Sequence, residues 1–221
     1  MLVALAFVPS APLLLPALGG GPDDLRSACQ QAISVLDDVE RLVVVGAAPR
    51  TGRCAGTVDA TGWGAPGAPA ADPLPLALAV GAGLLGDRPA ELYGVADGTA
   101  PGLVEGDRRT GLLVVGDGTA KRTEKAPGHF DPRAAELDER VVKAVAACDL
   151  TALRELDAAL ADELWVGGRQ AWAAAAAAAQ AEVRPGGAAP GGWTGEVSYA
   201  AAPYGVGYLV ATWLPADLVG V

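Results

Sequence analysis

Three short runs of uninterrupted apolar residues place the strongest constraint on the fold of this chain. They cover residues 2–8, 42–45 and 111–115. A strand with one solvated face alternates apolar and polar residues, whereas a continuous apolar run is typical of a strand that is covered on both faces. A helical pattern over residues 22–38 separates the first two runs, and a connection of that length favours parallel strands in a βαβ unit. The sequence therefore predicts a layered α/β fold.

Periodicity and turn-forming residues predict further elements. We expect a helix over residues 74–85 and strands over residues 91–96, 196–199 and 206–213. The segment 49–73 is rich in Gly, Pro, Ala and Thr, which indicates a long loop that either lines a site or lacks fixed structure. No internal repeat and no second domain boundary is visible, so residues 1–221 are expected to form one domain.

Capping residues predict helices in the second half of the chain. Asp131 stands before a proline and is the expected N-cap of a helix that runs to about residue 148. Thr151 and Asp157 are the expected caps of the next two helices. The second of these should continue through Trp165 and an alanine run to about residue 185. A flexible connector is expected over residues 186–192.

Charge and cysteine usage exclude several classes of partner. The chain carries 16 Lys and Arg against 26 Asp and Glu, a net charge of −10, which opposes binding to nucleic acid or to anionic lipid. No charge-free apolar run is long enough to span a membrane. The apolar N-terminus lacks a basic segment and is broken by prolines, unlike a signal peptide. The three cysteines are odd in number and form no CxxC pair, which favours reduced thiols in the cytoplasm.

Three segments, taken together and in order, carry a resemblance to a known family. They are FVPSAPLLLP (7–16), GDGTAKRTEKAPGHFDPRAAELDERV (116–141) and APYGVGYLVA (202–211), with LDAALADELWVGGRQAW (156–172) between the last two. They resemble the LigB-type superfamily, which comprises the catalytic subunits of class III extradiol ring-cleavage dioxygenases and the Memo-like proteins. The resemblance covers most of the chain and implies a mixed central β-sheet flanked by helices on both faces. It also implies a site at strand ends, where relatives bind Fe(II), a catechol-like diol and dioxygen.

The positions at which the resemblance places metal ligands lack suitable side chains. That chemistry needs two imidazoles and a carboxylate on one face of the iron, together with a base. The histidine positions of the family fall on the segment around Ser10, on Ala48 and on Ala120, and His129 is the only histidine in the chain. We therefore expect no Fe(II) cofactor and no metal site.

Several polar residues near these positions remain as candidates. Asp117 lies where relatives keep an aspartate, and it either caps local backbone or orients a ligand. Lys121, with its cationic and hydroxyl-bearing neighbours, is suited to a small carboxylate or phosphate, although solvated surface ion pairs explain the same pattern. His129 precedes a helix start and is more typical of a structural or surface residue. The residues expected to line the pocket are Ser10, Ala48, Asp117, Thr119, Ala120, Lys121, Arg122 and Tyr204.

These observations leave three hypotheses about function. The first is a non-catalytic or diverged homologue with a small-molecule pocket or a scaffold role. The second is an active enzyme of altered chemistry on aromatic or small acidic substrates, which uses either Asp117, Lys121 and His129 for acid/base work or a metal held by carboxylates. The third is a chain whose site is completed by a different polypeptide, and a homo-oligomer is likewise left open.

Overall fold

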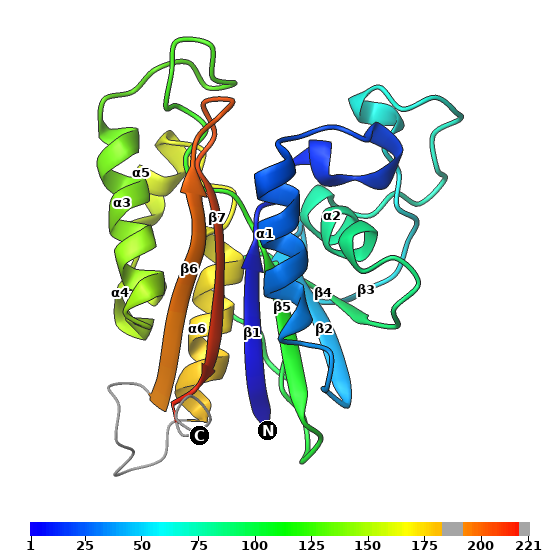
Figure 1. Cartoon of the computed structure of the whole chain (residues 1–221), viewed down its shortest axis with the longest axis vertical. Helices are drawn as coiled ribbons and strands as arrows, with labels where there is room; N and C mark the ends of the chain where they lie inside the picture. Colours follow the sequence, from blue (N-terminus) through cyan, green and yellow to red (C-terminus); the bar gives the residue numbers. More distant parts are fainter. Residues whose placement is uncertain (183–191, 217–221) are drawn as a thin grey trace.

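The computed structural model describes residues 1–182 and 192–216 and has a mixed, seven-stranded sheet with helices packed against it (Figure 1). The strands are β1 (Leu2–Val8), β2 (Arg41–Ala47), β3 (Gly52–Cys54), β4 (Glu91–Val95), β5 (Thr110–Val115), β6 (Trp193–Ala201) and β7 (Tyr208–Pro215). Their order in the sheet is β3-β4-β2-β5-β1-β7-β6. The strands β1, β2, β4 and β5 are parallel, while β3, β6 and β7 are antiparallel to their neighbours. The α/β class predicted from the apolar runs is confirmed.

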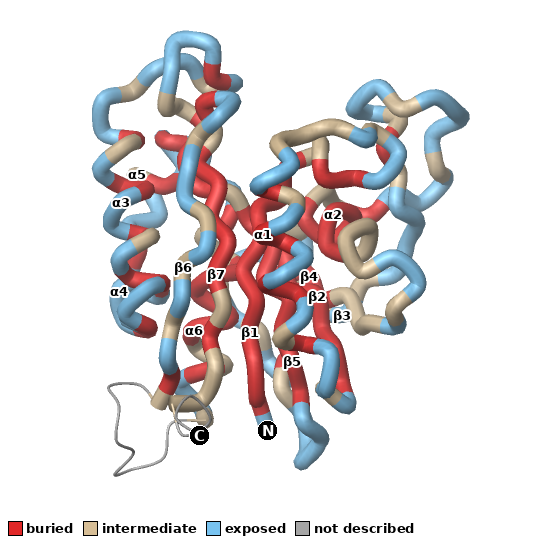
Figure 2. The backbone as a smooth tube through the Cα atoms, viewed as in Figure 1, coloured by how far each residue is buried: buried red, intermediate tan, exposed pale blue. Residues whose placement is uncertain are grey.

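The interior strands are buried because both faces of the sheet are covered. Every residue of β1 is buried, as is every residue of β5, and Figure 2 shows these strands as continuous buried segments at the centre of the molecule. The predicted parallel arrangement of β1 and β2 is present, but the two strands are not neighbours, since β5 pairs with both and lies between them. The edge strand β6 alternates between exposed and less exposed residues, which is typical of a strand with one solvated face.

Two hydrophobic layers, one on each face of the sheet, hold the helices in place. The first contains α1 (Asp23–Ser34), α2 (Leu76–Leu85) and the 3-10 turns η1 (Pro12–Leu14) and η2 (Pro16–Leu18). The second contains α3 (Arg133–Ala146), α4 (Leu150–Arg154), α5 (Ala158–Glu163) and α6 (Arg169–Ala181). On the second face the ring of Trp213 packs on Phe7 with centroids 4.9 Å apart, and its indole N–H donates to the carbonyl of Val145. This bond ties the end of α3 to β7.

The single helix predicted from Asp157 to about residue 185 is wrong, because the chain forms two helices there. Helix α5 ends at Glu163, and Trp165 adopts a left-handed conformation with φ of 58°. The N–H of Val166 donates to the carbonyl of Ala161, and the N–H of Trp165 donates to that of Asp162. This is a Schellman stop, which usually has glycine in the left-handed position. Because tryptophan rather than glycine occupies this position, the sequence does not indicate where the helix ends.

Other local predictions shift by a few residues. Thr151 is not an N-cap, since Asp149 takes that role and its carboxylate accepts the N–H of Ala152. Asp157 caps α5 as predicted. Pro132 occupies the N-cap position of α3, and the Asp131 carboxylate accepts the N–H of Arg133 from one residue earlier.

The remaining differences concern loops and strand ends. The segment 49–73, predicted as a long loop, contains two regular elements, β3 and the 3-10 turn η3 (Thr61–Trp63). The predicted strand over 196–199 is longer, and the strand predicted over 206–213 lies two residues later. The predicted connector over 186–192 falls, except for Gly192, outside the described residues. Within residues 1–182 and 192–216, no helix combines the length and the apolar character that a membrane crossing requires.

Candidate functional site

The register of the parallel strands brings three of the predicted site positions to one edge of the sheet. Val115 of β5 pairs with Val8 of β1 on one side and with Gly46 of β2 on the other. Ser10, Asp117 and Ala48 each follow these paired residues by two positions, so they lie at the carboxyl ends of three adjacent strands. Ligands of open α/β folds bind at this edge.

Ser10 and Asp117 form a closely bonded pair. The backbone N–H of Ser10 donates to Oδ1 of Asp117 at 2.8 Å, and the Ser10 hydroxyl donates to Oδ2 at 2.9 Å. Part of the Asp117 surface is accessible, yet protein atoms surround the carboxylate and desolvate it. This desolvation raises the pKa of Asp117 to about 6, and the two bonds from Ser10 offset only part of the effect. Burial, and then the nearby charge of Asp117, also raise the pKa of Tyr208 above its ordinary value.

The residues at this edge do not fit an Fe(II) centre of the kind that the resemblance implies. Ala48 and Ala120 have no donor atom, and the Ser10 hydroxyl is already bonded to Asp117. In the part of the chain that the structure describes, no group of three or more His, Cys, Asp and Glu side chains is placed to hold a metal ion. Facial coordination of ferrous iron by two imidazoles and a carboxylate therefore has no counterpart among these side chains.

A second polar cluster, centred on Asp138, lies on the α3 side of the same edge. Asp138 is 7% exposed, and its carboxylate accepts the backbone N–H of Thr119 at 2.8 Å and the Thr119 hydroxyl at 2.9 Å. Nη1 of Arg122 completes the cluster with an ion pair of 2.8 Å to Oδ2. Glycine is needed at positions 118 and 207, because a side-chain carbon at either would overlap the carboxylate. The cluster thus joins α3 to the turn after β5 and to the start of β7.

Sequence reasoning missed Asp138, although a signal was present. Ala134, Leu137, Val141 and Val145 form the buried face of α3, and Asp138 falls within this face by helical spacing. A carboxylate in an apolar stripe indicates a buried partner, because an unpaired buried charge is very costly. The cation in question, Arg122, belongs to the loop that we singled out from sequence, but the sequence does not show that the two meet.

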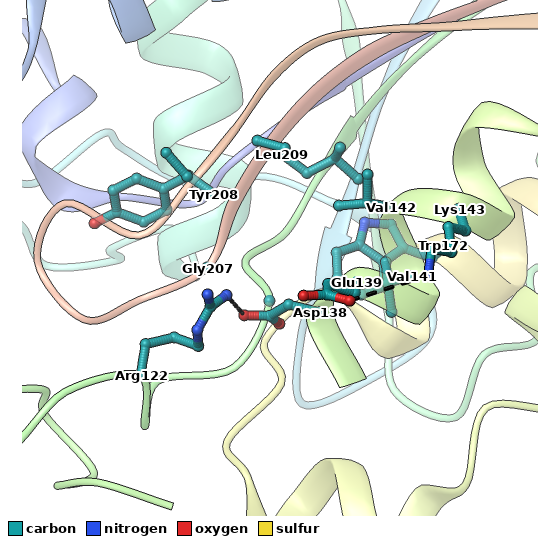
Figure 3. Close-up of a pocket in the computed structure, with 13 residues that line it drawn as sticks. Arg122, Asp138, Glu139, Val141, Val142, Lys143, Trp172, Gly207, Tyr208 and Leu209 are labelled. Carbon is teal, nitrogen blue, oxygen red and sulfur yellow. Dashed lines mark hydrogen bonds and ion pairs between the residues drawn. The ribbon is translucent and has the colours of Figure 1, made fainter. Parts of the chain in front are cut away.

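A cavity of about 370 Å³ lies next to this cluster, between α3 and the antiparallel strands (Figure 3). Its walls are mainly apolar and include Val141, Val142, Trp172 and Leu209, while Arg122, Asp138, Glu139 and Lys143 supply the charged groups. In Figure 3, Arg122 meets Asp138 near the middle of the view, and the Glu139 and Lys143 pair lies further along α3. The volume lies within the range of roughly 300–1,000 Å³ that is common for small-molecule pockets.

The other predicted site residues occupy different environments. Thr119 and Ala120 are buried, and the N–H of Ala120 donates to the carbonyl of Leu164. The ammonium of Lys121 lies 5.6 Å from the centre of the Trp165 ring. Tyr204 is half exposed in the turn between β6 and β7. Of the eight residues expected to line a pocket, Arg122 is the one that borders the 370 Å³ cavity.

His129 lies at the surface. Its Nε2 is 3.0 Å from a carboxylate oxygen of Glu124, and its Nδ1 is 3.0 Å from the Glu124 carbonyl. Both side chains are more than 70% exposed. In the described part of the chain, no ion pair or hydrogen bond joins Asp117 to His129 or to Lys121, so the three acid/base candidates are not assembled into one bonded constellation.

The arrangement offers a carboxylate bonded to a serine, a buried carboxylate paired with a partly buried guanidinium, and a mainly apolar cavity beside that ion pair. Comparison with models of known protein families gives no match to this chain, and neither does comparison with curated proteins.

Proposed function

We propose that this chain is a diverged relative of the LigB-type dioxygenases that binds a small aromatic acid without iron. The proposal places the ligand in the 370 Å³ cavity between α3, β6 and β7. Catalysis of ring cleavage is not part of the proposed function. The family assignment rests on the three sequence segments given above.

One observation supports the proposed absence of iron chemistry. The positions to which the resemblance assigns metal ligands hold Ser10, Ala48 and Ala120, and the serine is engaged by Asp117 through both its backbone N–H and its hydroxyl. A hydroxyl that donates to a carboxylate is a poor ligand for Fe(II), which prefers imidazole and carboxylate groups.

The lining of the cavity supports an aromatic acid as the ligand. Val141, Val142 and Leu209 supply flat apolar walls that suit a ring. The guanidinium of Arg122 uses Nη1 to bond Asp138, and its other side-chain N–H groups have no bonded partner among the described residues. A guanidinium with unused donors is well suited to a carboxylate.

An active enzyme of altered chemistry is supported by one feature, the raised pKa of Asp117. A carboxyl group that titrates near neutrality is suited to general acid/base catalysis. Lys121 and His129 contact Trp165 and Glu124 instead, and no bond joins either to Asp117 within the described residues, which favours the binding protein over a three-residue acid/base site.

Calorimetric titration of the purified, EDTA-treated protein with benzoate, 4-hydroxybenzoate and 3,4-dihydroxybenzoate tests the proposal. We expect saturable binding of at least one acid with no metal present. Val142→Phe should weaken that binding by tenfold or more, because it places a ring in the cavity and costs about 1.4 kcal/mol or more of binding free energy. Val58→Phe, at an exposed valine in the 49–73 segment, is the matched control and should bind like the parent.

Two results would overturn the proposal. One is stoichiometric iron that survives chelation, together with oxygen consumption in the presence of a catechol. The other is an absence of binding for all three acids by a folded protein.

A further inference from the structure

A second cavity, of about 580 Å³, lies along α6 and has a different lining from the cavity beside Asp138. It is bounded by residues 97–101, which follow β4, by Arg154 at the end of α4, and by Arg169, Ala173 and Ala177 of α6. The three α6 residues are four positions apart and form one stripe of the helix. Since α4 packs on α6, both arginines reach the same space. We refer to this cavity as the arginine pocket.

Among the described residues, the side chains of Arg154 and Arg169 have no bonded protein partner. Nε of Arg169 is buried, and none of these residues accepts a hydrogen bond from it. Within residues 1–182 and 192–216, the ion pairs involve other cations, and none includes Arg154 or Arg169. Acidic side chains are abundant in this chain, with 26 Asp and Glu against 16 Lys and Arg. Two guanidinium groups that share a cavity without a bonded carboxylate are therefore an unusual local arrangement here.

The position of Arg169 is set by the backbone around it. The N–H of Gly168 donates to the carbonyl of Asp117 at 2.8 Å, and a side-chain carbon on Gly116 would overlap Gly168. The first residue of α6 is thereby held against the turn that follows β5. These contacts fix the backbone of Arg169 and not its guanidinium, but the buried Nε still lacks an acceptor among the described residues, and an unsatisfied buried donor is destabilising.

We propose that the arginine pocket binds a small oxyanion, a phosphate monoester or a carboxylate, between Arg154 and Arg169. Guanidinium groups bind both kinds of anion through paired, charge-assisted hydrogen bonds. Small residues on α6 and in the 97–101 loop leave room for a ligand larger than a bare ion. The inference does not depend on the proposed aromatic-acid site, which lies in a different cavity with a different arginine.

Asp97 and Thr99 determine what else the ligand should carry. Oδ1 of Asp97 accepts both the N–H and the hydroxyl of Thr99, and these bonds hold the pKa of Asp97 below its ordinary value. The resulting charged carboxylate borders the pocket but does not pair with either arginine. A ligand that brings hydroxyl groups would satisfy this acceptor, so a hydroxylated phosphate or carboxylate fits better than a plain anion.

Calorimetric titration at constant ionic strength, with inorganic phosphate, glycerol 3-phosphate and malate as separate probes, tests the proposal. We expect saturable binding of glycerol 3-phosphate or malate that is stronger than that of inorganic phosphate. Glycerol 3-phosphate and malate distinguish a phosphate ligand from a carboxylate ligand. Arg169→Met should reduce the affinity about tenfold or more, because each lost charge-assisted bond is worth at least that factor.

Two further variants make the test specific. Arg154→Met, at an exposed residue, should also lower the affinity, and it carries the test if Arg169→Met does not fold. Arg140→Met removes an exposed arginine from α3 and is the control for net charge, so its affinity should equal that of the parent. The proposal is overturned if none of the three probes binds, or if the loss of affinity is the same in Arg140→Met as in the pocket variants.

Discussion

The Asp138 cluster and the arginine pocket each contain a partly buried arginine, Arg122 and Arg169, but the hydrogen bonding of the two side chains differs. In the Asp138 cluster, three donors from Thr119 and Arg122 satisfy one carboxylate. In the arginine pocket, the buried Nε of Arg169 has no acceptor within residues 1–182 and 192–216. Buried polar groups are normally satisfied within the protein. Among the described residues the Asp138 carboxylate follows this rule, whereas Nε of Arg169 departs from it, and this contrast underlies the proposed oxyanion site.

This difference teaches how to separate structural charges from functional ones in this fold. Arg122 does both: Nη1 pairs with Asp138 of α3 and holds the two elements together, while its other guanidinium N–H groups border the proposed aromatic-acid cavity. No such structural partner is present for Arg154 and Arg169 among the described residues. Substitutions in the Asp138 cluster test this contrast. They should lower the stability of the fold and leave the arginine pocket intact.

Removal of the Asp138 carboxylate should have the largest effect. Asp138→Ala leaves the guanidinium of Arg122 and the two donors of Thr119 without their acceptor. Breaking a buried ion pair on one side costs about 3–5 kcal/mol, and we expect a loss toward the lower end of that range in the free energy of unfolding because the Arg122 side chain is 28% exposed. Urea denaturation followed by circular dichroism measures the change.

Glu139→Ala is the matched control for this prediction. Glu139 is the next residue of α3, and its exposed carboxylate lies 4.0 Å from Lys143. An exposed pair of this kind contributes about 0.5 kcal/mol or less. Equal effects of the two substitutions would contradict the view that the Asp138 cluster holds α3 to the sheet edge.

The pKa of Asp117 predicts a pH-dependent effect of intermediate size. Burial raises this pKa from 3.8 to about 6, so the folded state binds a proton more tightly than the unfolded state does. The folded protein therefore loses stability, relative to Asp117→Asn, as the pH rises from about 4 through 6. The full difference above pH 7 should be on the order of 2 kcal/mol, after a discount for the accessible part of the residue.

Unfolding free energies of the parent and Asp117→Asn at several pH values between 3 and 8 measure this difference. Asp131→Asn is a control of opposite sign, because hydrogen bonds from Arg133 lower the pKa of Asp131 to about 2. That carboxylate stabilises the fold above pH 4 and loses its contribution as the pH falls toward 2. If the stability of the parent relative to Asp117→Asn did not change with pH, or rose with pH, the Asp117 carboxylate would not be desolvated.

The fold could be predicted from sequence where the signal was local. Continuous apolar runs identified β1, β2 and β5, since strands covered on both faces need no polar side. The division between α5 and α6 could not be predicted, because Trp165 takes the left-handed position where a glycine would have marked the helix end. The insertion of β5 between β1 and β2 depends on pairings between distant segments, which periodicity does not encode.

The candidate site was predictable only in part. The family resemblance predicted Ser10, Asp117 and Ala48 in one site at strand ends, and the register of the sheet places all three at the same edge. The ion pair of Arg122 with Asp138 joins residues from a loop and a helix, and their separation in sequence gives no sign of contact. Arg154 and Arg169 were not selected from sequence at all, because nothing local distinguishes a cation that lines a cavity from a solvated one.

Substitution of His129 should have the smallest effect on stability. This residue represents a third kind of charged group, an exposed side chain with an exposed partner. Its pair with Glu124 is surrounded by water, since both side chains are more than 70% exposed. Exposed pairs contribute about 0.5 kcal/mol or less, because solvent screens the charges and side-chain entropy opposes their association. His129→Ala should therefore change the free energy of unfolding by no more than that, and it should leave the binding of both aromatic acids and oxyanions unchanged. A loss of either binding activity would place the loop that carries His129 within reach of a ligand, and would mean that a group satisfied at the surface can still serve function.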